Sequence, residues 1–498
     1  MSERLSGRVT EDPSALVREL VLDPQFRYEA EHLLPWYLAI EKALVAEYLR
    51  MELIGEREAR TLGRLLDGVT PEGVEEKRSQ SLSDIALAIE RGVTERLTEP
   101  VPVWHADRSR NDLQACAQLM SAKRRLQETA GELHRLADAA RRLAGRTADV
   151  LMPGYTHFQS AQIISAGHYF AALGDRLLRR SRRMLQTYDL IDACPLGAGA
   201  MSGQELPWDR DRLAGLLGFD RAEPLALNAV ASREWAAEVT AELGLLGGTL
   251  SRFCTDLLMW AGSEHGFLDL PDALSGISAA MPQKKNFPIL ERIRGKTAHL
   301  AAFHVDVTLG QRNTPYSNLV EVSKEAGTHV AAAFDTCRDV LRLLTVVLEG
   351  LVLREDRLLE ACEQEYFGGF TLANRLTLCH GVPWRTAQVV AGGYVLAGVR
   401  AGRAPKDAAP DVLVALAAEH GHTVEDAAGL LADAFDVRRA LPRMRSAGSA
   451  APDEVRAALA VQKREGKELA AAWERRAAIV RQALDDTDHA LGAGADTK

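Results

Sequence analysis

The stretch SGISAAMPQKKNFPILERIRGK, residues 275–296, joins a loop of small residues to an apolar pattern at helical spacing. The loop carries Ser278 and ends at Pro282, which suits a first helical turn because the N–H that proline lacks has no helical partner there. Lys284 and Asn286 follow. We expect a mobile serine beside a helix start that bears lysine, which attracts an anion. The spacing alone equally describes an ordinary loop before a surface helix with solvated lysines, so the residue identities must decide.

The composition is that of a soluble globular protein. The chain has 498 residues, of which 47% are hydrophobic and 26% charged, and a formal net charge of −9, so no basic nucleic-acid-binding character is visible. The most apolar run, 343–353, is too short to span a bilayer. The N-terminal residues 1–8 lack the apolar core of a signal peptide, and the six cysteines form no CxxC pair. We expect a cytoplasmic protein with no nucleic-acid or membrane partner.

The hydrophobic pattern predicts an all-α fold built on long helices. Good helix formers dominate, and a helix from Asp112 to about Ala144 would span roughly 45–50 Å. Further long stretches repeat this pattern at 160–190, 230–262, 286–309 and 320–352. Such helices pack as a bundle. We expect three regions: an N-terminal helical domain (1–105), a central long-helix bundle (106–358) and a small helical C-terminal domain (359–498).

A polar cluster, HADRSRND at 105–112, precedes the longest predicted helix. Its Ser109, Asn111 and Asp112 are all suited to cap that helix. Ser109 and Asn111, with the arginines Arg108 and Arg110, would also make a seat for a carboxylate. The cluster is therefore either a helix cap or an anion site.

A second cluster, MPGYTHFQSAQ at 152–162, contains a Pro-Gly turn that should deliver Thr156 and His157 to the start of another helix. A lone histidine in such a position is more often structural than catalytic. Spacing alone therefore leaves its role open.

These segments resemble the ordered motifs of the fumarase/aspartase superfamily. The opening stretch resembles the GSSxMPxKxN signature, and its MPQKKN run is similar to that of the argininosuccinate lyase branch. HADRSRND is similar to the branch's HTGRSRND, and MPGYTHFQSAQ to its PGYTHLQRAQP. YSNLVEVSKE at 316–325 falls where the branch has YNRDLQEDKE. The resemblance runs from about residue 14 to Leu459.

The resemblance implies a β-elimination that breaks a C–N bond of a succinyl compound and releases fumarate. It places Ser278 at the catalytic general base, activated as an alkoxide, and Lys284 at the accompanying lysine. His157 falls on the acid–base histidine and Glu291 on the carboxylate partner of that histidine. The substrate-binding positions that it implies are Ser109, Arg110, Asn111, Thr156, Gln159, Asn286, Tyr316 and Lys324. In this family the motifs meet from three different subunits, so a homotetramer with shared sites is expected.

No metal or organic cofactor is expected. The histidines show no metal-ligand spacing. The glycine-rich GAGAMSG run at 197–203 is not a GxGxxG motif, and no predicted strand precedes it. It resembles instead the PLGSGAxAG turn of the same branch.

Several departures from the family pattern concern the substrate. Ile277 and Ala279 replace a glycine and a serine of the signature, and Glu321 replaces a glutamine. Family members carry a serine and, four residues later, an aspartate that contact the arginine half of the substrate, and we align these with Asp23 and Arg27. Such an acid-to-base change would repel a guanidinium and favour an anion. We therefore expect Arg27 to bind substrate, and an N-substituted L-aspartate other than argininosuccinate to be consumed.

Three alternatives stay open. The first is a genuine argininosuccinate lyase of arginine biosynthesis that tolerates these changes. The second is a non-catalytic structural protein like the lens crystallins derived from this family. The third is a related elimination or addition on another succinyl compound. Retention of the set Ser278, Lys284, His157 and Glu291 argues against the second, because a scaffold has no use for it.

Overall fold

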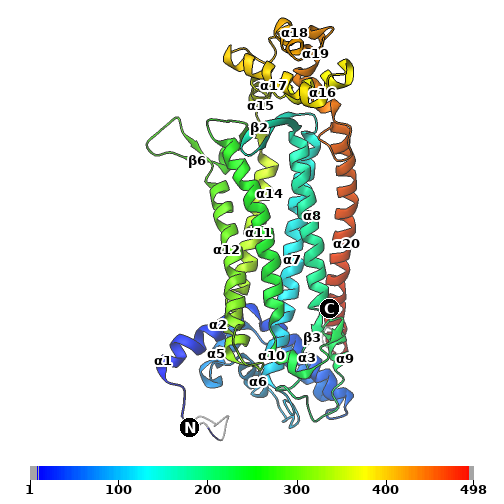
Figure 1. The fold of residues 1–498 in the computed structure, drawn as a ribbon. Helices are drawn as coiled ribbons and strands as arrows, with labels where there is room; N and C mark the ends of the chain where they lie inside the picture. The colour runs from blue at the N-terminus through cyan, green and yellow to red at the C-terminus, as the bar shows by residue number, and fades with distance from the viewer. Residues whose placement is uncertain (1–7, 9–10, 493–498) are drawn as a thin grey trace.

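The computed structural model describes residue 8 and residues 11–492. Apart from Arg8, the N-terminal start discussed above lies outside these residues. The all-α prediction is confirmed: long helices run side by side in one column, and strands form only short pairs (Figure 1). Among the described residues, none of the helices has both the length and the apolar character needed to cross a membrane.

The column is a bundle of long helices. α7 packs against α8 and α14, and α11 packs against α12. The long helices are α7 (Arg110–Arg146), α8 (Ala166–Leu190), α11 (Glu234–Ala261), α12 (Pro288–Gln311), α14 (Val330–Gly350) and α20 (Pro452–Ala490). The predicted long stretches thus contain helices, with boundaries shifted by several residues.

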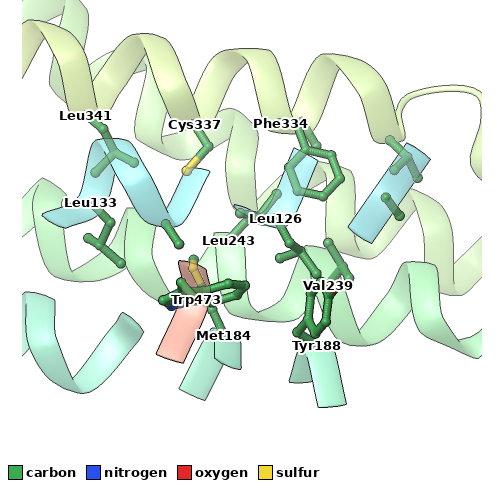
Figure 2. Close-up of a cluster of buried hydrophobic side chains, with 14 of the residues drawn as sticks. Leu126, Leu133, Met184, Tyr188, Val239, Leu243, Phe334, Cys337, Leu341 and Trp473 are labelled. Atoms are coloured by element: carbon green, nitrogen blue, oxygen red, sulfur yellow. The ribbon is translucent and has the colours of Figure 1, made fainter. Parts of the chain in front are cut away.

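The bundle core is formed by apolar side chains that the helices direct toward one another (Figure 2). Within it, the indole Nε1 of Trp473 donates a hydrogen bond to Ser181 Oγ over 3.2 Å. The side chains labelled in Figure 2 come from α7, α8, α11, α14 and α20: Leu126, Leu133, Met184, Tyr188, Val239, Leu243, Phe334, Cys337, Leu341 and Trp473. Burial of such side chains is the main stabilising contribution to the bundle.

The predicted C-terminal domain, 359–498, is divided in the structure. Five short helices lie at one end of the column, and those from α16 to α19 enclose a separate core that runs from Leu372 to Phe435 (Figure 1). These helices are α15 (Glu355–Gln364), α16 (Gly369–His380), α17 (Trp384–Arg400), α18 (Pro410–Glu419) and α19 (Ala427–Ala434). The 39-residue α20 instead returns along the bundle, because its apolar stripe, including Leu469 and Trp473, joins the main core.

The N-terminal helices lie at the other end of the column, and those from α2 onward contribute side chains to the main core (Figure 1). They are α1 (Ala15–Val17), a π-helical turn (Arg18–Leu22), α2 (Asp23–His32), α3 (Leu34–Arg50), α4 (Glu56–Asp67), α5 (Pro71–Lys77) and α6 (Ile85–Thr94). The side chain of Asp84 caps α6 by accepting from the Leu87 N–H over 3.1 Å. Residues 1–105 are therefore an end of the bundle rather than a body with its own core.

Short elements connect the long helices. Two antiparallel pairs form hairpins, β1 (Leu151–Thr156) with β2 (Gln159–Ser165) and β6 (Gly276–Ile277) with β7 (Lys285–Asn286). The remaining strands are β3 (Ala193–Cys194) parallel to β4 (Arg221–Ala222), and β5 (Leu268–Asp269) antiparallel to β8 (Val352–Leu353). The remaining α-helices are α9 (Arg210–Leu216), α10 (Ala226–Ala231) and α13 (Val320–Ser323).

Candidate active site

The structure places the predicted site residues at opposite ends of one helix. α7 has 37 residues, which corresponds to about 55 Å. At its start lies the N-cap end, which we define by Ser109, Arg110, Asn111, Tyr316, Lys324 and the helix α2 that carries Arg27. Beyond its other terminus lies the hairpin end, defined by Thr156, His157, Gln159, Ser278, Lys284, Asn286 and Glu291. One copy of the chain therefore does not bring the predicted residues together.

Ser278 lies in the loop of the β6–β7 hairpin, in which Gly276 pairs with Asn286. Its Oγ accepts a hydrogen bond from the backbone N–H of Met281 over 3.1 Å. The Asn286 amide donates to the Ile277 carbonyl over 3.2 Å and so closes the hairpin. A backbone donor on the serine oxygen stabilises negative charge there.

The expected helix start at Pro282 is wrong. Pro282 lies in a turn of the hairpin loop, and α12 begins at Pro288, which occupies the first helical position. The strand pairing of residues 285–286 uses the segment that the sequence assigned to the first helical turn. Lys284 is thus held on a hairpin and not on a helix terminus.

The two adjacent lysines of the hairpin differ in their partners. Lys285 Nζ lies 3.0 Å from Asp269 Oδ1 and 3.1 Å from Asp272 Oδ1, and it donates to the Leu270 carbonyl over 2.6 Å. Hydrogen bonds that the ammonium donates to these carboxylates raise the pKa of Lys285. Lys284 is exposed and forms no ion pair with any described residue. The ammonium available to a ligand is therefore that of Lys284.

His157 lies at the tip of the β1–β2 hairpin, not at a helix start as predicted. Both tip residues have a positive φ, 53° at His157 and 59° at Phe158. The helix α8 begins only at Ala166, where Ser165 Oγ accepts from the His168 N–H over 3.0 Å. The hairpin was not predicted because Pro153 and Gly154 were interpreted as a turn, whereas both lie within β1 and pair with Ile163 and Gln162.

His157 and its predicted carboxylate partner do not meet within one chain. His157 is exposed and has no hydrogen-bond or ion-pair partner among the residues that the structure describes. Glu291 is exposed in the first turn of α12 and likewise has no cationic partner in the described part of the chain. Both side chains are free to face another molecule.

At the N-cap end, Ser109 has the capping role that the sequence offered as an alternative. Its Oγ accepts from the Asn111 N–H over 3.2 Å. The Asn111 amide donates to the Ala200 carbonyl over 3.2 Å, and Arg110 lies 2.7 Å from the Asp84 carboxylate. These groups gather where the partial positive charge of a 37-residue helix favours an anion.

Asp112 is a residue whose role the sequence did not reveal. It is fully buried, and its Oδ2 accepts from the N–H groups of Gly197 and Gly199, each over 3.0 Å. Both glycines have positive φ values, 82° and 62°, which side-chain-bearing residues rarely adopt. Burial raises the pKa of Asp112 to about 7. Asp112 therefore fixes the glycine-rich turn, which in turn supplies the Ala200 carbonyl to the Asn111 amide.

Lys324 is held by Glu29, which the sequence analysis also missed. Its Nζ lies 3.6 Å from Glu29 Oε1, and Glu29 is only 4% exposed. The same carboxylate accepts from Gln25 over 2.8 Å and from Gln114 over 2.9 Å. Burial raises the pKa of Glu29. In the segment that leads to Lys324, the Tyr316 hydroxyl donates to Asn228 Oδ1 over 3.1 Å.

The alignment of Asp23 and Arg27 with the family's specificity pair stays a prediction, and the structure describes the surroundings of both residues. Asp23 is ion-paired with Arg78 and accepts from the Ser83 hydroxyl over 2.7 Å, whereas Arg27 is exposed. Gln25 and Glu29, also four residues apart, are the α2 residues beside Lys324. A shift of two positions turns a side chain by about 200° around a helix, so the two pairs face different surroundings.

Comparison with known proteins identifies the family. A family model described as Lyase matches residues 69–301. The argininosuccinate lyase of Thermus thermophilus is 34% identical over 485 residues, which cover 92% of this chain and 98% of that protein. The chain belongs to the argininosuccinate lyase family. As a member of that family it is a carbon–nitrogen lyase.

Two solved structures share the fold of this family member. EDDS lyase in complex with formate superposes with a TM-score of 0.84 at 24% identity, covering 97% of this chain and 96% of that one. Class II fumarase from Schistosoma mansoni superposes with a TM-score of 0.67 at 15% identity, covering 83% of this chain and 91% of that one. Both likenesses concern the fold. In the part of the chain that the structure describes, no three His, Cys, Asp or Glu side chains gather as a metal site.

Proposed function

We propose that the chain removes an amine from an N-substituted L-aspartate by β-elimination and releases fumarate. The observation that carries this proposal is the Ser278 hydroxyl, which accepts the Met281 N–H in a hairpin whose Lys284 ammonium is unpaired among the described residues. A serine is a weak base unless its alkoxide is stabilised. The backbone donor and the neighbouring ammonium both lower the pKa of an alcohol.

The reaction proceeds through a carbanion. Ser278 takes a proton from the carbon next to one carboxylate, and the electron pair moves into that carboxylate as the aci form. The C–N bond then breaks, the electrons return to form the C=C bond of fumarate, and the departing nitrogen takes a proton from His157. The doubly charged carboxylate needs strong donors in a site that excludes water, for which Lys284 and Asn286 are suited. Glu291 orients His157 and raises its basicity.

The site is assembled from several copies of the chain, as a homotetramer. The support for this step is the separation of about 55 Å that α7 imposes between Ser109 and the hairpins. A substrate of succinate size cannot contact both ends of one copy. Copies packed in opposite directions would bring the N-cap end of one to the hairpin ends of others. Ser109, Asn111, Thr156 and Lys324 then hold the substrate carboxylates.

A second candidate substrate is argininosuccinate itself, and a specific observation favours it. The carboxylate of Glu29 lies 3.6 Å from Lys324, a residue that the family resemblance assigns to substrate binding. A buried carboxylate favours an amine half that carries a guanidinium or ammonium group. This observation weakens the argument for an anionic leaving group, which rested on Arg27. The proposed elimination is the same for both candidate substrates.

Fumarate absorbance, measured with a set of substrates, tests both the proposed reaction and the identity of the substrate. The purified chain is incubated with argininosuccinate and with N-substituted aspartates whose amine half is cationic, neutral or anionic. Fumarate from at least one of them, lost in Ser278→Ala, supports the lyase. Fumarate from none of them supports the non-catalytic alternative. Preference for cationic amines supports Glu29 as the residue that selects the amine half. Preference for anionic amines supports Arg27 in that role.

A further inference from the structure

Arg233, at the start of α11, is a buried guanidinium that lacks a carboxylate partner in the described part of the chain. It is 3% exposed. Its Nε donates to Gln118 Oε1 over 2.9 Å, and its Nη1 donates to the carbonyls of Val230 and Ser232 over 3.0 and 2.9 Å. Its Nη2 is buried and has no hydrogen-bond partner among the described residues. A buried cation left in this state is costly, so a missing anionic partner is indicated.

A small cavity of about 30 Å³ lies against this residue. Its wall includes a second guanidinium, from Arg125, and the hydroxyl of Ser121, but neither Asp nor Glu is among the lining residues. Arg125 Nη1 lies 3.0 Å from Asp335 Oδ1, a carboxylate that does not line the cavity. The charge of Arg125 is thus neutralised by an ion pair, whereas that of Arg233 is not. The volume suits one or two waters or a single monatomic ion. It is too small for the succinyl substrate.

The charge state of Arg233 agrees with a cavity wall that contains neither Asp nor Glu. Burial lowers the pKa of Arg233 to about 10, and no carboxylate contributes an opposing effect. The guanidinium therefore remains charged near neutral pH. A cation with an unpaired N–H, in a cavity without acidic side chains, attracts an anion more strongly than it attracts water.

We propose that this cavity binds one small inorganic anion of chloride size through the Nη2 of Arg233. The anion completes the hydrogen bonding of the guanidinium and compensates its charge. Because Gln118 also donates to the Ser323 carbonyl over 2.7 Å, the anion stabilises the turn that precedes Lys324. The site does not depend on the identity of the lyase substrate.

The first test uses crystals of the full chain grown or soaked in bromide. Bromide scatters anomalously and replaces chloride in such sites. The expected result is an anomalous difference peak within hydrogen-bond distance of Arg233 Nη2. A peak absent at saturating bromide, with ordinary water density in the cavity, overturns the proposal.

The second test compares thermal unfolding in chloride and in gluconate, an anion too large for the cavity, at one ionic strength. At about ten times its dissociation constant, a bound anion shifts the unfolding equilibrium roughly 11-fold, so the wild type should melt higher in chloride. Arg233→Gln should abolish the difference, whereas Arg182→Gln, which removes an exposed arginine paired with Glu465, should retain it. Equal melting of the wild type in both salts contradicts the proposal. If Arg233→Gln does not fold, the bromide experiment on the wild type decides alone.

Discussion

The backbone N–H of Met281 donates a hydrogen bond to the hydroxyl of Ser278, with 3.1 Å between nitrogen and Oγ. This contact closes a loop of small residues on the serine that the proposed reaction uses as its base. A hydroxyl that accepts such a bond is prepared to carry negative charge before the substrate arrives.

Replacement of Ser278 by alanine should lower kcat by roughly three orders of magnitude or more, because general-base catalysis is lost. KM should change little, since the carboxylates are held elsewhere. The measurement is fumarate release under saturating substrate. Ser275→Ala is the matched control, because that hydroxyl donates to the Pro271 carbonyl over 2.9 Å and has no assigned catalytic role. Near-normal turnover in Ser278→Ala would remove Ser278 from the mechanism.

The two hairpin lysines should behave differently when each is replaced by methionine. Lys284→Met should lower kcat about 100-fold or more, because a cation near the developing negative charge is lost. Lys285→Met should instead loosen the hairpin by freeing Asp269 and Asp272, with a smaller effect on kcat and faster proteolysis of residues 275–287. Kinetics and limited proteolysis of both variants check this assignment. The reverse pattern would move the catalytic role to Lys285.

Mixing two inactive variants should restore activity if the site is shared among copies. His157→Asn and Ser278→Ala are each expected to be inactive, and co-refolding them should yield some sites with both residues intact. Ser109→Ala with Asn111→Ala is the control pair. Both of these residues lie at the start of the same helix, so one copy supplies both of them to a site. Every site in a mixed assembly therefore retains one of the two substitutions. Absence of recovery in the first pair would contradict assembly from several copies.

Replacement of Glu29 by glutamine should change substrate preference. The ratio of kcat/KM for cationic over anionic amine halves should fall about tenfold, which corresponds to about 1.4 kcal/mol, because a carboxylate is lost beside Lys324. Asp23→Asn serves as the control, since Asp23 pairs with Arg78 and should affect stability without changing the ratio. An unchanged ratio in Glu29→Gln would show that this carboxylate does not face the amine half.

Asp112 should make stability depend on pH. Its folded pKa is raised to about 7 from 3.8, so between these values the folded chain keeps a proton that the unfolded chain has released. The free energy of unfolding should therefore fall as pH rises through this window, by up to about 1.4 kcal/mol per pH unit. Asp112→Asn should lack this contribution. Denaturant titrations of both proteins from pH 4 to about 7 should show that the free energy of unfolding falls less steeply with pH in the variant than in the wild type.

The long helices could be predicted from sequence because their apolar stripes repeat at helical spacing over many turns. The helix predicted from Asp112 to about Ala144 corresponds to α7, Arg110–Arg146. The return of α20 along the bundle could not be predicted, since an amphipathic helix does not reveal which core its stripe joins. Grouping 452–490 with the short C-terminal helices followed sequence proximity alone.

The site residues could be named from motifs, but their local geometry could not. Two-residue strands such as β7 are too short to show an alternating pattern, so Lys284 was assigned to a helix start. Asp112 was visible only as a possible cap. Its actual partners are glycines 85 and 87 positions away in the sequence. Glu29 was missed because none of the motifs that carried the resemblance reaches α2.

The length of α7 also bears on how such an enzyme can evolve. Mutations in α2 alter the surroundings of Glu29 while the Ser278 hairpin, far along the molecule, keeps its fold. New amine specificities can thus arise without rebuilding the reactive loop. In a cell that expresses this chain together with a close paralogue able to co-assemble with it, hybrid particles would combine the selectivity of one gene product with the reactivity of the other.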